Sequence, residues 1–240
     1  MTTADERGEA RRSELAANLA DVRERIEHAC AQAGRAPDTV RLIAVTKTFP
    51  AGDVMSLAGL GITEIGENRD QEAAAKAAAL REAGVEVHWH YIGRMQRNKA
   101  KSVAAYAHLV HSVDRPGLVT ALADAARDRE SPLGCLIQVS VDGDTARGGV
   151  AESELGALVD SVTSRPELAL RGIMAVAPMD WTPERAFEQV AALSEKVRAA
   201  VPEAVEISAG MSGDFPQAIG FGATLVRIGS ILLGSRSHLR

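Results

Sequence analysis

A regular alternation of short apolar segments with helical patterns is the feature that most constrains the fold. Eight segments read as strands, and a helical pattern separates each of the first seven from the next. Strict alternation predicts a parallel sheet with right-handed crossovers, and eight units predict a single α/β domain closed as a (β/α)₈ TIM barrel. An open doubly wound sheet is the alternative. The predicted strands are 42–45, 62–67, 85–92, 109–113, 135–141, 170–176, 206–209 and 224–228.

The predicted helices start with a long amphipathic segment at 12–34, which ends near a glycine and carries one apolar stripe. No full helix is predicted after the last strand, so we expect this N-terminal helix to cover that seam of the barrel. Residues 1–11 are expected to form a disordered tail, and 12–240 a single barrel domain. The other predicted helices are 52–60, 68–84, 95–106, 116–129, 152–163, 182–200 and 216–219.

Composition excludes several classes of protein. The net charge of -5 argues against a nucleic-acid binder, because such proteins neutralise phosphates with surplus lysine and arginine. The N-terminus lacks the apolar core of a signal peptide, and no apolar run reaches membrane-spanning length. The two cysteines, Cys30 and Cys135, have no metal or redox spacing. These features predict a reduced, cytoplasmic enzyme or binding protein without a membrane segment.

Lys47 is the first candidate functional residue, because it follows the unbroken apolar run 42–45. Such a run is typical of a strand buried on both faces, and ligands bind at the carboxyl ends of parallel strands. A partly desolvated lysine there is a nucleophile that condenses with aldehydes. Taken alone, Lys47 also fits an ordinary lysine that extends from a strand end into water.

Two glycine- and serine-containing loops follow the last two strands, where barrels commonly hold a phosphate group. Glycines let backbone N–H groups approach phosphate oxygens, and Ser212 and Ser230 can donate hydrogen bonds directly. Either loop alone also fits an ordinary turn. The pair, 210–214 and 226–230, favours a phosphate site.

Arg227 lies inside an otherwise apolar strand, where an unpaired charge is costly. Its guanidinium is therefore expected to face either a ligand or a carboxylate partner. One ligand would account for Lys47, the two loops and Arg227 together, namely a phosphorylated aldehyde with a polar ring.

Motifs along the chain resemble those of the pyridoxal phosphate homeostasis protein family, also called the proline synthase co-transcribed family. The resemblance extends from about residue 15 to 236, with the motifs in the same order. They are Ala44-Val-Thr-Lys47, Ile65-Gly-Glu-Asn-Arg69, Trp89-His-Tyr-Ile-Gly-Arg-Met-Gln-Arg-Asn-Lys99, His111-Ser-Val-Asp114, Arg171-Gly-Ile-Met174, Ala209-Gly-Met-Ser-Gly-Asp214 and Val226-Arg-Ile-Gly229.

The resemblance implies a barrel similar to the N-terminal domain of bacterial alanine racemase, with pyridoxal 5'-phosphate (PLP) held as a Schiff base on Lys47. By position, Arg227 would face the pyridine nitrogen, and Asn68 and Met211 would lie near the ring. The residues implied to hold the phosphate are Ser212, Gly213, Gly229 and Ser230.

The resemblance also implies little or no turnover. A cation at Arg227 would leave the ring nitrogen unprotonated and the ring a poorer electron sink. Neither Tyr91 nor Tyr106 lies at an expected catalytic strand end, and no second domain is expected after Arg240. We therefore expect a monomeric carrier without catalytic residues, which keeps free PLP, a form of vitamin B6, low and delivers it to apo-enzymes. The alternatives are a weak amino-acid racemase and a Schiff-base aldolase using His90 or Glu67.

Two other clusters have competing interpretations. His88 and His90 share one strand face, but no further ligand is clustered with them, so no metal site is expected. A basic cluster at the start of a predicted helix is interpreted either as a solvated face or as a docking or anion site. This cluster comprises Arg94, Arg97, Lys99 and Lys101.

Overall fold

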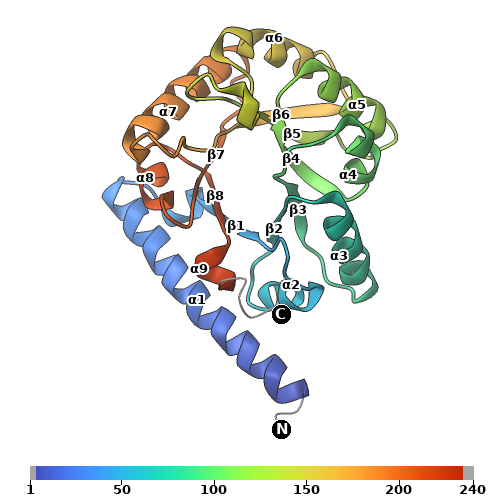
Figure 1. Ribbon diagram of the computed structural model, residues 1–240, viewed down its shortest axis with the longest axis vertical. Helices are drawn as coiled ribbons and strands as arrows, with labels where there is room; N and C mark the ends of the chain where they lie inside the picture. Colours follow the sequence, from blue (N-terminus) through green and yellow to red (C-terminus); the bar gives the residue numbers. More distant parts are fainter. Residues whose placement is uncertain (1–3, 235–240) are drawn as a thin grey trace.

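The predicted strands form a closed barrel of eight parallel strands, arranged around the barrel in sequence order (Figure 1). The computed structural model describes residues 4–234. The closed order confirms the TIM barrel and excludes the open sheet. The strands are β1 (Arg41–Val45), β2 (Glu64–Glu67), β3 (His88–Tyr91), β4 (Ala107–Val113), β5 (Leu133–Gln138), β6 (Leu168–Met174), β7 (Glu206–Met211) and β8 (Leu225–Ile228).

Helices surround the barrel on its outside (Figure 1). The predicted basic helix at 95–106 differs, because its first part is a short 3-10 turn, η2 (Arg97–Lys99). Two more such turns are η1 (Pro37–Thr39) and η3 (Thr145–Arg147). The α-helices are α1 (Ala4–Gln32), α2 (Ala51–Ala58), α3 (Asp70–Glu82), α4 (Ala100–Tyr106), α5 (Pro116–Ala126), α6 (Glu152–Thr163), α7 (Pro183–Ala200), α8 (Phe215–Gly220) and α9 (Ser230–Leu233).

The prediction of a disordered tail over 1–11 is wrong for residues 4–11, which form the first turns of α1; residues 1–3 lie outside the described residues. Arg11 shows why this segment is ordered. Its Nη2 donates to the Asp53 carboxylate at 2.7 Å and to the Leu233 carbonyl at 3.0 Å. These partners lie on α2 and α9, so the sequence near the N-terminus gives no sign of them.

The expectation that the N-terminal helix covers the seam after the last strand is confirmed. Helix α1 packs against α8, α9 and α2, and it lies beside them in Figure 1. It buries Leu15, Leu19 and Val22 almost completely. The helix α9, which was not predicted, is a single turn and is too short to cover this side alone.

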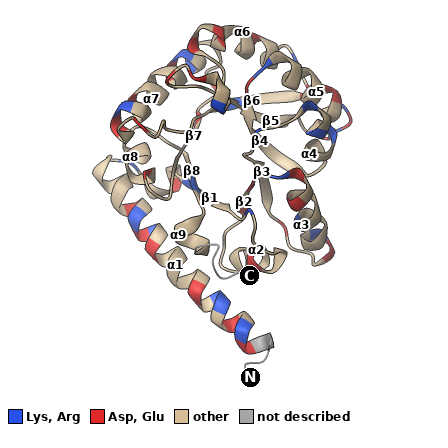
Figure 2. Ribbon diagram, viewed as in Figure 1, with Lys and Arg blue, Asp and Glu red and all other residues tan. Residues whose placement is uncertain are grey.

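Apolar side chains form two layers, one inside the barrel and one between the strands and the helices. Ile43 belongs to the inner cluster and its neighbour Ala44 to the outer core, which explains the unbroken apolar run of β1. Charged residues lie mainly on the surrounding helices, and α1 carries both signs along its length (Figure 2). None of the helices within residues 4–234 is both long and apolar enough to cross a bilayer.

Candidate functional site

A cavity of about 590 Å³ lies at the carboxyl ends of β1, β7 and β8, and we call it the lysine cavity. It brings together all the predicted site residues except Asn68. Asn68 does not line it, and its Oδ1 is buried without a hydrogen-bond partner among the described residues. The lining residues are Val45, Lys47, Phe49, Ile92, Met211, Ser212, Gly213, Arg227, Gly229, Ser230 and Gly234.

Lys47 follows a firmly held residue, Thr46, at the end of β1. Thr46 is fully buried, and its Oγ1 donates to Glu67 Oε1 at 2.6 Å. Lys76 of α3 donates from Nζ to the Thr46 carbonyl at 2.8 Å and to Glu67 Oε1 at 2.6 Å. These bonds fix the backbone from which the Lys47 side chain enters the cavity.

Glu67 is engaged in this buried group and is not a free base beside Lys47. Burial raises the pKa of Glu67, although hydrogen bonds from Lys76 and Thr46 oppose the rise. This role of Lys76 was not predicted from the sequence. The available signal was a single lysine within the alanine-rich helix 68–84.

The chain turns sharply after Lys47. Thr48 has a φ of 71°, a left-handed conformation that is strained for a β-branched residue. Its backbone N–H donates to the Glu72 carboxylate at 3.0 Å, which holds the turn. The Lys47 amine itself makes no hydrogen bond or ion pair within residues 4–234. The turn therefore presents a half-buried amine to the lysine cavity.

The two loops opposite Lys47 carry hydroxyl groups with unused donors. Ser212 Oγ accepts a hydrogen bond from the Gly229 N–H at 3.4 Å, and this contact joins the two loops. Neither Ser212 nor Ser230 donates its hydroxyl hydrogen to another described residue. A Cβ added at Gly213 would meet nothing within 4 Å, so the backbone there is open to a ligand. Such a donor set suits an anion with several oxygens.

Arg227 is 5% exposed and lines the same cavity. Its Nη1 donates to the Ser208 carbonyl at 2.7 Å and to Ser208 Oγ at 2.6 Å, and its Nη2 donates to the Ala175 carbonyl at 2.8 Å. No described carboxylate forms an ion pair with it, so the salt-bridge interpretation is excluded within residues 4–234. Burial lowers the pKa of Arg227 to about 10, and the guanidinium stays charged at neutral pH. The negative charge of Asp214 opposes this shift, but no described carboxylate contacts the guanidinium, so the buried cation favours an acceptor or anion in the cavity.

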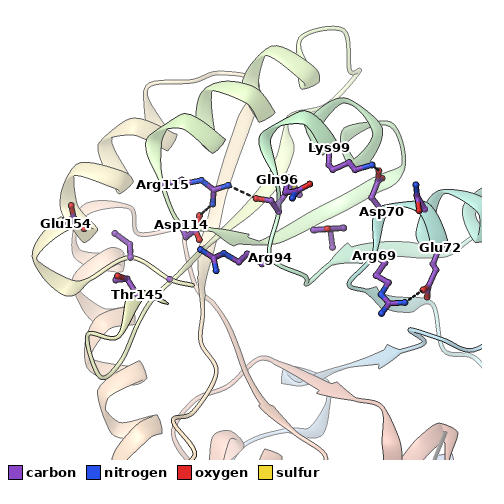
Figure 3. Close-up of a pocket in the computed structure, with 15 residues that line it drawn as sticks. Arg69, Asp70, Glu72, Arg94, Gln96, Lys99, Asp114, Arg115, Thr145 and Glu154 are labelled. Carbon is purple, nitrogen blue, oxygen red and sulfur yellow. Dashed lines mark hydrogen bonds and ion pairs between the residues drawn. The ribbon is translucent and has the colours of Figure 1, made fainter. Parts of the chain in front are cut away.

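The basic cluster of the sequence analysis contributes Arg94 and Lys99 to a second cavity, of about 1000 Å³. This mixed-charge cavity lies near the carboxyl ends of β2, β3, β4 and β5. Figure 3 shows the charged side chains that line it. Its charges are largely compensated. The ion pairs are Arg69 with Glu72 at 2.9 Å, Lys99 with Asp70 at 3.6 Å, and Arg115 with Asp114.

His88 and His90 have other partners in the structure. No group of three or more metal-ligating side chains occurs within the described part of the chain. His90 instead bonds Glu64 on one side and His111 on the other, inside the barrel.

Comparison with known sequences places these features in a family. The family profile of the alanine racemase N-terminal domain matches residues 14–237. A pyridoxal phosphate homeostasis protein of Mycobacterium tuberculosis is 44% identical over 244 residues, covering 94% of each chain. The protein of that description from Escherichia coli is 35% identical over 230 residues, covering 94% of this chain and 98% of its own.

Solved structures agree. PipY of Synechococcus elongatus, with PLP bound, superposes with a TM-score of 0.80 at 31% identity, covering 92% of this chain and 100% of that one. Alanine racemase of Corynebacterium glutamicum has a TM-score of 0.68 at 16% identity, covering 94% of this chain and 61% of that one. At that identity the racemase shows a common fold and nothing more.

Proposed function

Because this chain belongs to the pyridoxal phosphate homeostasis protein family, we propose that it binds PLP in the lysine cavity and takes part in its homeostasis. One observation carries the proposal. Among the described residues, the lysine cavity combines an amine without a partner at Lys47, a guanidinium without an ion pair at Arg227 and two serine hydroxyls with unused donors. PLP offers a matching aldehyde, ring nitrogen and phosphate.

Each residue has a role suited to its chemistry. Lys47 holds the aldehyde end, since bound PLP supplies a carbonyl carbon that condenses with the amine to a Schiff base and loses water. Ser212 and Ser230 donate to the phosphate, together with the backbone of Gly213 and Gly229. Arg227, which can only donate, hydrogen-bonds the ring nitrogen and leaves it unprotonated.

Met211 and Asn68 complete the proposed site. Met211 lines the cavity, is 40% exposed and offers a flexible apolar contact for the ring. Asn68 stays a prediction from the resemblance, and its unpartnered Oδ1 is the feature of this structure that fits a polar ring substituent.

The composition of the lysine cavity supports a carrier with little or no turnover. Its described lining contains no imidazole, carboxylate or phenol, so no second acid or base accompanies Lys47. Tyr91 lines the mixed-charge cavity instead, and Tyr106 lies at the end of α4. We therefore propose that Lys47 captures and releases PLP. We also propose that the protein is a cytoplasmic monomer that buffers PLP and delivers it to apo-enzymes.

Absorption spectroscopy of the purified protein tests the proposal directly. We expect visible absorption upon addition of PLP, and borohydride reduction followed by peptide mass mapping should place the label on Lys47. Lys47→Ala should lose this label, whereas Lys99→Ala, a matched lysine variant in the mixed-charge cavity, should keep it. A wild-type protein that stays colourless with excess PLP would contradict the proposal. Detectable racemisation of amino acids would contradict the carrier role alone.

A further inference from the structure

A line of hydrogen bonds inside the barrel connects the lysine cavity with the opposite end of the molecule. Arg227 Nη1 lies 2.6 Å from Ser208 Oγ, which lies 2.9 Å from His111 Nδ1. His111 Nε2 lies 2.9 Å from His90 Nδ1, and His90 Nε2 bonds Glu64 Oε2. We call Ser208, His111, His90 and Glu64 the relay. It crosses from β8 through β7, β4 and β3 to β2.

The relay is buried along its length and ends near solvent. Ser208 and His111 are fully buried, and His90 is 2% exposed. Glu64 is the first residue of β2 and lines a cavity of about 270 Å³ at the amino ends of the strands, together with His88 and His108. The relay therefore joins the two ends of the barrel.

With His90 neutral, the chemistry of the relay members gives every hydrogen bond a single direction. Burial acts to raise the pKa of Glu64, but hydrogen bonds from His90 and His88 lower it to about 2, so Glu64 is an acceptor. His90 Nε2 must then carry its hydrogen. Arg227 can only donate, so Ser208 Oγ accepts from it and gives its own hydrogen to the next member.

His111 completes this order. Burial, with the positive charges of Arg227 and Arg41, holds the pKa of His111 well below its usual value, so the ring is neutral. Its Nδ1 accepts from Ser208, and its Nε2 donates to His90 Nδ1. All four bonds then point from the cation at Arg227 to the carboxylate of Glu64. Bonds aligned in this way polarise one another and strengthen the whole chain.

We propose that Ser208, His111 and His90 are positioning residues through which the Glu64 carboxylate holds Arg227 in place for the ligand of the lysine cavity. Glu64 thus acts as the remote counter-ion of a guanidinium that has no ion-pair partner among the described residues. Arg227 Nε makes no hydrogen bond within residues 4–234 and remains available to the ligand. The identity of that ligand rests on the proposed function.

Nitrogen NMR of the wild-type, ligand-free protein gives the first test. His90 and His111 should both carry a hydrogen on Nε2 and a bare Nδ1. A hydrogen on Nδ1 of neutral His111 would overturn the proposal, because the relay would then run in the opposite direction at Ser208.

A double-mutant cycle gives the second test. Glu64→Gln preserves shape and removes the charge, whereas Ser208→Ala removes one oxygen and cuts the relay. Glu64→Gln should shift the side-chain nitrogen signals of Arg227 and weaken PLP binding by about threefold to tenfold. In the Ser208→Ala background, Glu64→Gln should change neither the Arg227 signals nor the PLP affinity. An equal effect in both backgrounds, or none in the wild-type background, would overturn the relay.

A matched control and the ligand-free readout separate this inference from the proposed function. His108→Asn changes a histidine of the same small cavity that is outside the relay, and it should leave Arg227 unchanged. If the Arg227 signals respond as expected but no PLP label forms on Lys47, the relay stands and the proposed function fails. If the PLP label forms on Lys47 but Glu64→Gln leaves the Arg227 signals unchanged, the relay is contradicted and the proposed function stands.

Discussion

The lysine cavity and the mixed-charge cavity differ in size and in the state of their charges. The mixed-charge cavity is larger, about 1000 Å³ against about 590 Å³, but its arginines and lysine are largely paired with carboxylates. The lysine cavity has fewer charges, and both Lys47 and Arg227 lack a carboxylate partner among the described residues. We therefore propose the smaller cavity as the ligand site, because its charged groups lack ion-pair partners among the described residues.

Removing the charge of Arg227 should have the largest effect among the following changes. Arg227→Gln should weaken PLP binding by about 10- to 100-fold, because a hydrogen bond from a charged group contributes about 1.5–3 kcal/mol. Fluorescence or absorption titration measures the change, and urea unfolding checks that the barrel persists. If a folded Arg227→Gln protein bound PLP as tightly as the wild type, the charge of Arg227 would not distinguish the lysine cavity as the ligand site.

The stability of the protein in acid should depend on Glu64, the residue at the far end of the relay from the lysine cavity. The pKa of Glu64 is about 2 in the folded protein, against an ordinary value of 4.5. Its stabilising contribution is therefore fully present above about pH 4.5 and is lost as the pH falls toward 2. Glu64→Gln should lower the free energy of unfolding at neutral pH by about 1–2 kcal/mol and flatten its fall across this interval. Urea unfolding midpoints of the wild type and of Glu64→Gln, measured between pH 2 and 6, test this. The same pH dependence in both proteins would contradict the prediction.

The serine hydroxyls should contribute less and should act on the phosphate alone. Ser212→Ala and Ser230→Ala should each weaken PLP binding by about fivefold, since one hydrogen bond contributes about 1 kcal/mol. Binding of unphosphorylated pyridoxal should not change. An equal loss for both ligands would place these hydroxyls elsewhere than at the phosphate.

The smallest effect is expected in the mixed-charge cavity. Arg94→Ala removes a side chain whose Nη1 donates to the Ala146 carbonyl at 3.1 Å, and it should leave PLP affinity unchanged within twofold. Stability should change by less than about 0.5 kcal/mol. A large loss of PLP binding in Arg94→Ala would indicate that PLP binds in the mixed-charge cavity and not in the lysine cavity.

The sequence predicted the barrel because each strand and helix has its own local pattern, as in the unbroken run of β1. The sequence also placed Lys47, Ser212 and Arg227 at neighbouring strand ends, because strand-end position and residue type are local properties, and the three line one cavity. The Thr46, Glu67 and Lys76 group was not predicted, because its members meet only after α3 has packed on the barrel. Asn68 was predicted by resemblance alone and lies outside the cavity lining.

The errors have the same physical origin. The order of residues 4–11 depends on partners near positions 53 and 233, and the relay needs five strands in register. Polar residues in buried strands, such as His90 and His111, were visible in the sequence. Their partners were not, because closure of the sheet decides which strands face one another.

The lysine cavity combines residues from the first strand of the barrel and from the last two. Lys47 follows the first strand and Arg227 lies in the last, and the two strands pair directly, Ile43 with Arg227. The ribosome must therefore synthesise β8 as well as β1 before the proposed ligand site can form. A half-made barrel has Lys47 but lacks Arg227 and the loops opposite it, so the proposed site is incomplete. PLP binding at the proposed site would therefore be a late event in the life of each molecule and would report that the ring of strands has closed.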